Sequence, residues 1–495
     1  MRGLGMAAIG AALLLAGPAP AQRSPIPPLK PLTMTAVAGT RQFVTVHQGI
    51  FNGKRVRYRA TVGETIVRLA DQHPVASLFS FAYEAMDGGD PARRPVIFIF
   101  NGGPGGASAP LHLSSIGPKI LARVDTASFA DPTVPLIDNP ASPLDVADLV
   151  FIDPTDTGFS RTLPGAPPGL FHSVDGDSEA VAQLIACWLR DHRRTASPLY
   201  LFGESYGSMR AVALARDLVR LPEKIVVDGV MLGGPAITYG QAGNLPNPGR
   251  KANELVMMAS VAWHYGKIDN KGQSWTAAVE KARHFARGDY LHALELGFTL
   301  DDATRERIVR QLPRIIGIPE RYFRENHTIL VANFNAELLR DEGLVLDRNT
   351  GLEAKPAKPD SAAGGEGLSG LDHAMMVYSA GDLKATGLGP YTTLTPDTAF
   401  VTRDWDFTTA GAPALDVVLS RTMKEHPAMR LLITQGRYDT LTQMGITEYT
   451  MMQTDLPRDR VTTVYYDGGH FLTATPEAMA GLRTFVGAPT SRIRQ

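Results

Sequence analysis

The amino-acid sequence predicts an α/β fold in which a mostly parallel central sheet has helices on both faces and carries a mainly helical cap insertion. Two observations support this fold class. Several short apolar runs are rich in β-branched and aromatic residues, as buried parallel strands are, and helix-like segments lie between some of them, as in an open α/β sheet. The apolar runs are 95–100, 149–153, 199–202, 225–232, 429–434 and 461–466, and the helix-like segments are 178–190 and 209–221.

Other segments place the edge of the sheet and the insertion. Near the start of the chain, three segments alternate more visibly between apolar and polar residues and are expected to be antiparallel edge strands. They are 43–45, 55–61 and 76–83. The strand pattern then stops after Pro235 and returns near Met429, which predicts a mainly helical cap insertion over 236–401 with a Pro/Gly-rich loop at 355–370. The expected helices of the insertion are 254–265, 275–287, 291–296 and 301–311, and the core is expected to be discontinuous, over 22–235 and 402–495.

Composition and charge exclude several classes of protein. The chain has 495 residues, of which 44% are hydrophobic, and its 49 basic side chains nearly balance 50 acidic ones. A chain of this size and composition can bury a large core, which excludes a disordered, collagen-like or small disulfide-stabilised protein. A formal net charge of −1 argues against nucleic acid as a partner, because nucleic-acid binding depends on positive charge.

The first residues, 1–21, have the pattern of a secretory signal peptide. Arg2 supplies the positive start, 6–17 form a short apolar stretch, and Ala19 to Ala21 form a small-residue cleavage site. The apolar stretch is too short to cross a bilayer, so we expect an exported protein, periplasmic or secreted, without stable membrane insertion. Cys187 is the only cysteine, which excludes an internal disulfide; we interpret it as buried filler, with a nucleophile as the alternative.

The sharpest motif is Gly203-Glu204-Ser205-Tyr206-Gly207, between a predicted strand and a predicted helix. In that context G-x-S-x-G is typical of a tight turn that exposes a nucleophilic serine. A serine needs a base and a carboxylate that orients the base, and on this architecture they follow in the order Ser, Asp, His at later strand ends. Asp439 and His470 combine that order with that position, whereas the rivals His172, His192, His264, His426 and Asp467 do not.

A glycine-rich loop, 101–106, follows the strand 95–100. Its backbone N–H groups can approach a ligand closely, which suits an oxyanion hole formed by the amides of Gly103 and Tyr206. A plain glycine turn or a phosphate loop is the alternative, but neither the G-x-G-x-x-G spacing nor a Gly-Lys-Ser/Thr sequence is present.

Three motifs together resemble the serine carboxypeptidase family: Asn101 to Gly105, Asp153 to Ser160 and Gly203 to Gly207. Asp439 and the Gly469-His470 pair complete the set in the same order, so the resemblance runs from about residue 95 to 476, and 262–267 is similar to the insertion of bacterial relatives. It implies an α/β-hydrolase fold and an exopeptidase that removes one residue from the C-terminus of a peptide. It also implies that Asn101, Gly102 and Glu204 bind the free carboxylate of the substrate.

A physical argument makes the role of Glu204 plausible. Two carboxyl groups at short range repel unless one of them is protonated. We therefore predict that peptidase activity is higher at about pH 4–6 than at about pH 8. The chain departs from the plant and fungal family members in having Ser115 where they have a second Glu, and Ile99 where they have a Trp before the loop. These departures predict a weaker hold on the carboxylate, or a different pH dependence, and a reshaped subsite.

Two other functions stay open on the sequence alone. The same Ser-His-Asp residues can serve an esterase or acyltransferase, and a non-catalytic envelope binding protein on the same scaffold is the third hypothesis. No metal-binding motif such as H-E-x-x-H is present, the histidines are scattered, and no cofactor is expected. The expected substrates are peptides with a free C-terminus.

Overall fold

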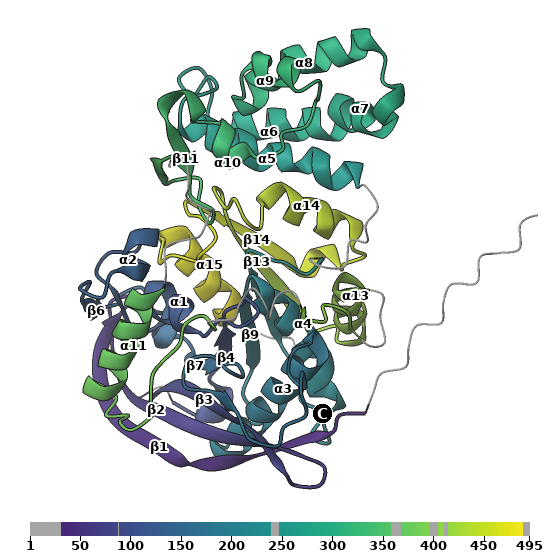
Figure 1. The fold of residues 1–495 in the computed structure, drawn as a ribbon. Coiled ribbons are helices and arrows are strands. Elements are labelled where there is room, and N and C mark those ends of the chain that lie inside the picture. Colours follow the sequence, from purple (N-terminus) through teal and green to yellow (C-terminus); the bar gives the residue numbers. More distant parts are fainter. Residues whose placement is uncertain are drawn as a thin grey trace, which may run out of the picture.

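A ten-stranded mixed sheet forms the centre of the molecule, with the order β1-β2-β3-β7-β4-β9-β10-β13-β14 and β8 paired to β3 (Figure 1). This computed structural model describes residues 31–87, 89–238, 247–357, 368–395, 404–409 and 414–488. The strands are β1 (Met34–Phe51), β2 (Lys54–Leu69), β3 (Pro74–Ala85), β4 (Val96–Phe100), β7 (Asp148–Asp153), β8 (Arg161–Thr162), β9 (Leu199–Glu204), β10 (Gly229–Gly233), β13 (Arg430–Gly436) and β14 (Val461–Tyr466).

From β7 to β14 the neighbouring strands are parallel, as the sequence predicts. Every residue of β4, β7, β9 and β10 is buried, which explains why these strands read as continuous apolar runs. The predicted strand 225–232 begins later, at Gly229. The residues before it are irregular: the Ile225 amide donates to the Leu218 carbonyl, and the Asp228 carboxylate accepts from the Leu199 amide.

The three N-terminal strands are antiparallel, as predicted, but β1 and β2 are far longer than the sequence pattern indicates. Three apolar residues, Val44, Val46 and Ile50, lie on the exposed side of β1, where they are 54%, 58% and 57% exposed. Apolar residues on a solvent face hide the alternation that marks a half-buried strand, and this is why the pattern predicted only 43–45.

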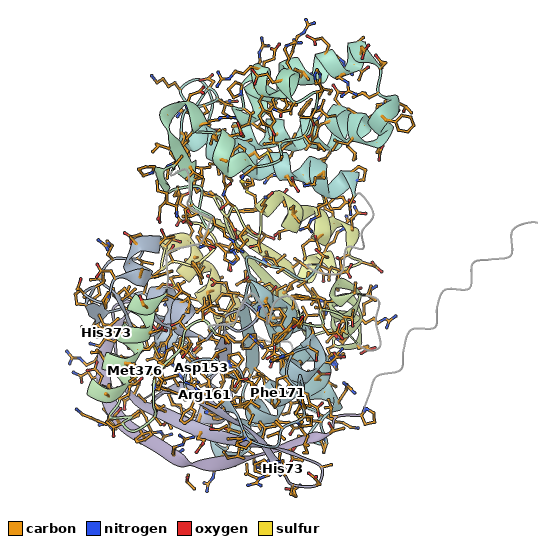
Figure 2. The ribbon with its side chains drawn as sticks, in the orientation of Figure 1. His73, Asp153, Arg161, Phe171, His373 and Met376 are labelled. Atoms are coloured by element: carbon orange, nitrogen blue, oxygen red, sulfur yellow. The ribbon has the colours of Figure 1, made fainter. Side chains whose placement is uncertain are left out.

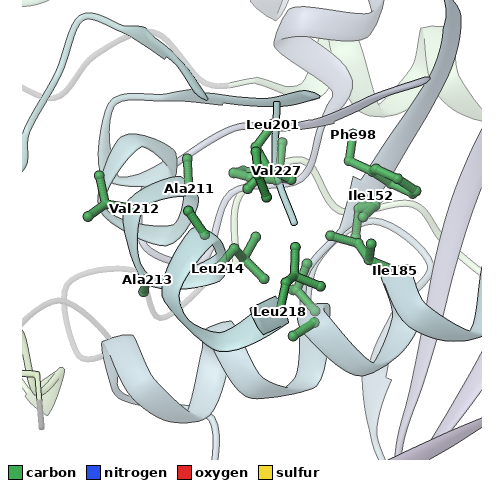
Figure 3. Packing of buried hydrophobic residues seen from close by; sticks show 14 of the residues in the cluster. Phe98, Ile152, Ile185, Leu201, Ala211, Val212, Ala213, Leu214, Leu218 and Val227 are labelled. Atoms are coloured by element: carbon green, nitrogen blue, oxygen red, sulfur yellow. The ribbon is translucent and has the colours of Figure 1, made fainter. Parts of the chain in front are cut away.

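Helices cover both faces of the sheet. On one face α3 (Val174–Asp191), α4 (Tyr206–Arg220) and α13 (Leu415–Glu425) share one apolar cluster with the strands. Figure 3 shows Ile185 of α3 and Leu218 of α4 against sheet residues that include Phe98 and Leu201. Cys187 is buried in α3 as a free thiol. On the other face lie α1 (Ala109–Leu111), α11 (Ser369–Gly381) and α15 (Pro476–Gly487).

Six helices of the predicted insertion form a separate apolar cluster, which lies beyond β13 and β14 in Figure 1. They are α5 (Pro248–His264), α6 (Trp275–Phe285), α7 (Leu291–Leu296), α8 (Asp302–Ile316), α9 (Glu320–Glu325) and α10 (Phe334–Glu337). A hairpin follows, β11 (Leu344–Leu346) and β12 (Ala354–Pro356), whose turn is hydrogen-bonded to the loops that follow β13 and β14. α11 packs against α2 (Thr126–Ala130) of the core instead, and its residues His373 and Met376 lie there in Figure 2. The insertion boundaries at 236 and 401 therefore stay a prediction.

Two predictions from the sequence lie outside the described residues: the signal peptide at 1–21 and most of the loop at 355–370, of which 358–367 are not described. Among the helices that are described, none combines the length and the apolar character that crossing a bilayer requires.

Candidate active site

Ser205 lies at the turn between β9 and α4, with φ 58° and ψ −127°. A positive φ is rare for a residue with a side chain, and it is the strained geometry expected of a nucleophile elbow. A Cβ atom on Gly203 would lie 1.9 Å from the Gly207 carbonyl oxygen, so only glycine fits at that position. Ser205 donates its amide to the Gly233 carbonyl at 2.8 Å, which ties the elbow to the neighbouring strand.

His470 and Asp439 follow β14 and β13, and the structure brings them together. His470 Nδ1 lies 3.1 Å from Asp439 Oδ2, and both side chains are buried. Burial by itself lowers the pKa of His470, but the adjacent Asp439 carboxylate outweighs it and the net pKa is raised. The contact at Nδ1 leaves the other ring nitrogen of His470 to act on a neighbouring proton.

The Asp439 carboxylate is held by donors that sequence reasoning missed. Its Oδ1 accepts from the backbone amides of Leu441 and Thr442 at 2.9 and 2.8 Å, and its Oδ2 accepts from the Thr442 hydroxyl at 2.6 Å. The same hydroxyl lies 3.0 Å from His470 Nδ1. The sequence contains one signal for this role of Thr442, namely its position three residues after Asp439, since Asx-type turns place such donors beside a carboxylate.

The glycine loop lies directly against the elbow. A Cβ atom on Gly102 would be 2.5 Å from the Tyr206 amide nitrogen, and Gly103 has φ +113°. Gly102, Gly103 and Ser205 line the same cavity. The structure therefore brings the Gly103 and Tyr206 segments together beside Ser205, where an oxyanion hole requires its donors.

Glu204 is buried under Ser205, and both of its oxygens accept hydrogen bonds. Oε1 accepts from Asn101 Nδ2 at 2.7 Å and Oε2 accepts from the Leu472 amide at 2.7 Å. Burial raises the pKa of Glu204 to about 7, although the nearby His470 charge and the Leu472 hydrogen bond act in the opposite direction. A carboxyl group with this pKa exchanges its proton in the neutral range.

Arg210 of α4 joins the elbow to the loop, although no sequence motif marks this arginine. Its guanidinium is fully buried, donates to the Asn101 carbonyl at 2.7 Å and donates to Asp177 Oδ2 at 2.8 Å. Asp177 also accepts from the Tyr206 hydroxyl at 3.0 Å. Because the buried charge is paired and hydrogen-bonded on both sides, this cluster fixes the glycine loop relative to the helix that carries the elbow.

The catalytic candidates meet in one cavity of about 320 Å³, and Asp439 lies behind its wall. Its wall includes Ser205, His470, Glu204 and Asn101, together with apolar residues and Arg348.

Ser115 is buried and donates its hydroxyl to the Leu111 carbonyl. Ile99, which was expected to reshape a subsite, is buried within β4 instead of lining the cavity. Asp153, at the start of the motif 153–160, is buried, and its Oδ1 accepts hydrogen bonds from the Ser108 amide and from the Tyr391 hydroxyl. Figure 2 labels Asp153 and the neighbouring Arg161.

The rival histidines lie elsewhere in the fold. His172 stacks on Trp405, His192 stacks on Trp188, and His264 packs against Tyr265 and Tyr438. Within the described ranges, no three His, Cys, Asp or Glu side chains are grouped so that they could hold a metal ion.

Comparison with known proteins finds a similarity to one family over part of the chain. The family model described as serine carboxypeptidase matches residues 69–276, which include the glycine loop and the elbow but neither Asp439 nor His470. Serine carboxypeptidase-like 13 of Arabidopsis thaliana is 26% identical over 148 residues, which are 30% of this chain and 33% of the relative. The matched part therefore spans about a third of that relative's length.

A solved structure resembles most of the fold. The crystal structure of Kex1Δp, a prohormone-processing carboxypeptidase from Saccharomyces cerevisiae, matches with a TM-score of 0.53 at 14% identity, covering 84% of this chain and 86% of the yeast chain. At this identity the likeness establishes the α/β-hydrolase fold.

The close approach of loop and elbow makes a sharp prediction for Gly102→Ala. The added methyl group would collide with the Tyr206 amide, so the oxyanion donors would separate and kcat/KM for a small ester would fall about 100-fold. Gly63→Ala on β2 is the matched control, because its nearest neighbouring atom would be 3.9 Å away. Equal activity of both variants would show that the loop takes no part in catalysis.

Thr442→Val tests the support of Asp439. It removes one hydrogen bond to a charged group, so kcat is expected to fall about 10-fold with little change in KM. Thr462→Val, on the exposed side of β14, is the control. Unchanged kcat in steady-state assays would mean that the two backbone amides alone hold the carboxylate.

Proposed function

We propose that this chain belongs to the serine carboxypeptidase family and is a serine-type carboxypeptidase, which hydrolyses the last peptide bond of peptides that have a free C-terminus. The observation that carries the proposal is the composition of the cavity. It combines Ser205 and His470 with the buried pair Asn101 and Glu204 in one space of about 320 Å³. A nucleophile, a base and a group that can bind a carboxylate are the parts that an exopeptidase requires.

In the proposed reaction, His470 takes the hydroxyl proton of Ser205 as the oxygen attacks the carbonyl carbon of the last peptide bond. Asp439 orients the imidazole through its 3.1 Å contact with Nδ1 and stabilises the imidazolium that forms. His470 then gives the proton to the amine of the departing residue, and an ester to Ser205 remains. Water, deprotonated by His470, hydrolyses this ester and restores the serine.

The negative charge on the carbonyl oxygen develops next to the glycine loop. We assign its two donors to the amides of Gly103 and Tyr206. Preorganised donors of this kind contribute several kcal/mol to transition-state stabilisation, about 3–4 kcal/mol for a single donor. Arg210 acts on this step as a positioning residue, because it holds the Asn101 carbonyl at the start of the loop.

Asn101, Gly102 and Glu204 are proposed to receive the free carboxylate of the substrate. Glu204 can share a proton with that carboxylate only while one of the two carboxyl groups is protonated. The hydrogen bond from protonated Glu204 to a charged carboxylate is stronger than the one it makes to a neutral C-terminal amide, which favours cleavage at free C-termini. Ser115 donates its hydroxyl to the Leu111 carbonyl and adds no carboxyl group to the site. Glu204 and the substrate carboxylate therefore share their proton with one carboxyl group fewer than in the plant and fungal members.

The chain is further proposed to be a bacterial protein that is exported to the periplasm or secreted, because the signal pattern at 1–21 is combined with a single cysteine. The insertion, proposed at 236–401, supplies part of the cavity wall through its hairpin turn. Substrate selection beyond the free carboxylate is therefore expected to depend on insertion residues.

A pair of substrates tests the proposed function. An N-blocked dipeptide should release its C-terminal amino acid, whereas the same dipeptide as a C-terminal amide should be cleaved at least about 100-fold more slowly. Ser205→Ala should lower kcat for the free acid by about 10⁶-fold. Equal cleavage of acid and amide would refute the carboxylate-binding role, and hydrolysis of esters without any peptide cleavage would favour the esterase.

The pKa values predict a bell-shaped pH dependence of kcat/KM for the free acid. Protonation of His470 limits activity on the acid side, and loss of the Glu204 proton above its pKa of about 7 limits it on the alkaline side. Because the pKa of His470 is raised above its usual value, these two limbs place the maximum of kcat/KM near neutral pH, less acidic than the range of about pH 4–6 expected from the sequence. In Glu204→Gln the amide donates at every pH, so the alkaline limb should disappear while the acid limb remains. An alkaline limb that persists in this variant would contradict the assignment.

A further inference from the structure

Arg348 lines the cavity that contains Ser205 and His470, although it comes from the inserted part of the chain. It lies in the turn between β11 and β12, and three hydrogen bonds hold this turn against the loops of the candidate triad. The His470 amide donates to the Asn349 carbonyl at 2.7 Å, the Thr440 hydroxyl donates to the Arg348 carbonyl at 2.7 Å, and the Gly351 amide donates to the Tyr438 carbonyl at 2.8 Å. The position of Arg348 is therefore coupled to both catalytic loops.

The Arg348 guanidinium has no carboxylate partner among the residues that the structure describes. The two acidic side chains nearest the reaction centre are already occupied: Glu204 by Asn101 and Leu472, and Asp439 by His470, Thr442 and two backbone amides. Asp347, in the same turn, accepts from the Asn349 amide. The charge of Arg348 also reaches His470, whose pKa it lowers against the stronger effect of Asp439.

A second chamber, of about 210 Å³, adjoins the cavity and shares Asn349, His470 and Phe471 with it. Its wall carries three acidic side chains, those of Asp125, Glu353 and Asp467. The cleft thus has a cationic part near Ser205 and an acidic part beyond His470. A negatively charged group on a substrate is repelled from the second chamber and attracted towards Arg348.

We propose that Arg348 binds a carboxylate of the peptide substrate, either the free C-terminal carboxylate or an acidic side chain beside the cleaved bond. This inference rests on the proposed function, whose substrate it specifies further. A guanidinium matches a carboxylate with two parallel hydrogen bonds and stays charged at all relevant pH values. Recognition by Arg348 therefore needs no shared proton, and it adds to the contact that Asn101 and Glu204 are proposed to make.

The test compares Arg348→Met with the wild type and with Arg314→Met, an exposed arginine of α8 in the same insertion. Substrates are an N-blocked Phe-Leu dipeptide, the matched pairs Glu-Leu and Gln-Leu, and Phe-Glu and Phe-Gln, together with ethyl esters of N-blocked Phe, Glu and Gln. The Phe ester carries no carboxylate and reports on the triad alone. Loss of a bidentate charged contact should lower kcat/KM by about 10- to 100-fold for substrates that use it.

Two outcomes support the proposal and identify the source of the carboxylate. If Arg348→Met weakens all dipeptides alike but leaves Phe ester turnover unchanged, the guanidinium binds the C-terminal carboxylate. If it removes only a preference for Glu over Gln, the guanidinium binds an acidic side chain.

Other outcomes overturn it. An equal loss for every substrate, including the Phe ester, would mean that Arg348 only holds the turn in place, and no change with any substrate would mean that it faces solvent without a role. If the wild type cleaves esters but no dipeptide, the proposed function fails separately, and the Glu and Gln esters then decide the question for Arg348.

Discussion

The close contact between the glycine loop and the nucleophile elbow is the constraint on which the rest of the site depends. β4 and β9 are neighbours in the parallel sheet, so the loops at their carboxyl ends must pass each other in a space that admits no side chain at Gly102. Arg210 connects the elbow helix to the glycine loop through its hydrogen bond to the Asn101 carbonyl. Because backbone packed in this way cannot shift freely, the donors beside Ser205 are fixed before a substrate arrives.

The same packing buries charges, and each buried carboxylate is stabilised differently. Asp439 accepts hydrogen bonds from two backbone amides and lies beside the imidazole of His470, whereas burial dominates at Glu204 and raises its pKa to about 7. Two carboxyl groups in one site are thereby suited to two tasks: one orients a base, and the other exchanges a proton at neutral pH. Arg348 adds a permanent positive charge at the mouth, where the exposed part of the cleft meets the insertion.

Much of this arrangement could be predicted because it follows from local patterns. Ser205, Asp439 and His470 follow β9, β13 and β14 within a few residues, and the carboxyl ends of parallel strands meet at one edge of a sheet. The glycine loop can be recognised from its composition. The full length of β1 could not be predicted, because exposed valines interrupt its alternation. The roles of Arg210 and Arg348 could not be predicted either. In the sequence Arg210 resembles any arginine in a helix and Arg348 any arginine in a turn, and only the tertiary structure brings Arg210 against Asn101 and Arg348 to the cavity.

The central claim is that Ser205 is a nucleophile activated by His470 in this cavity. Intact-mass spectrometry after reaction with a peptidyl phosphonate, followed by mapping of the labelled peptide, tests it most directly. The account predicts one phosphonyl group per chain, attached to Ser205, and a rate of labelling that falls about 10³-fold or more in His470→Ala. Labelling of a different residue, or labelling of Ser205 at an unchanged rate in that variant, would contradict the account.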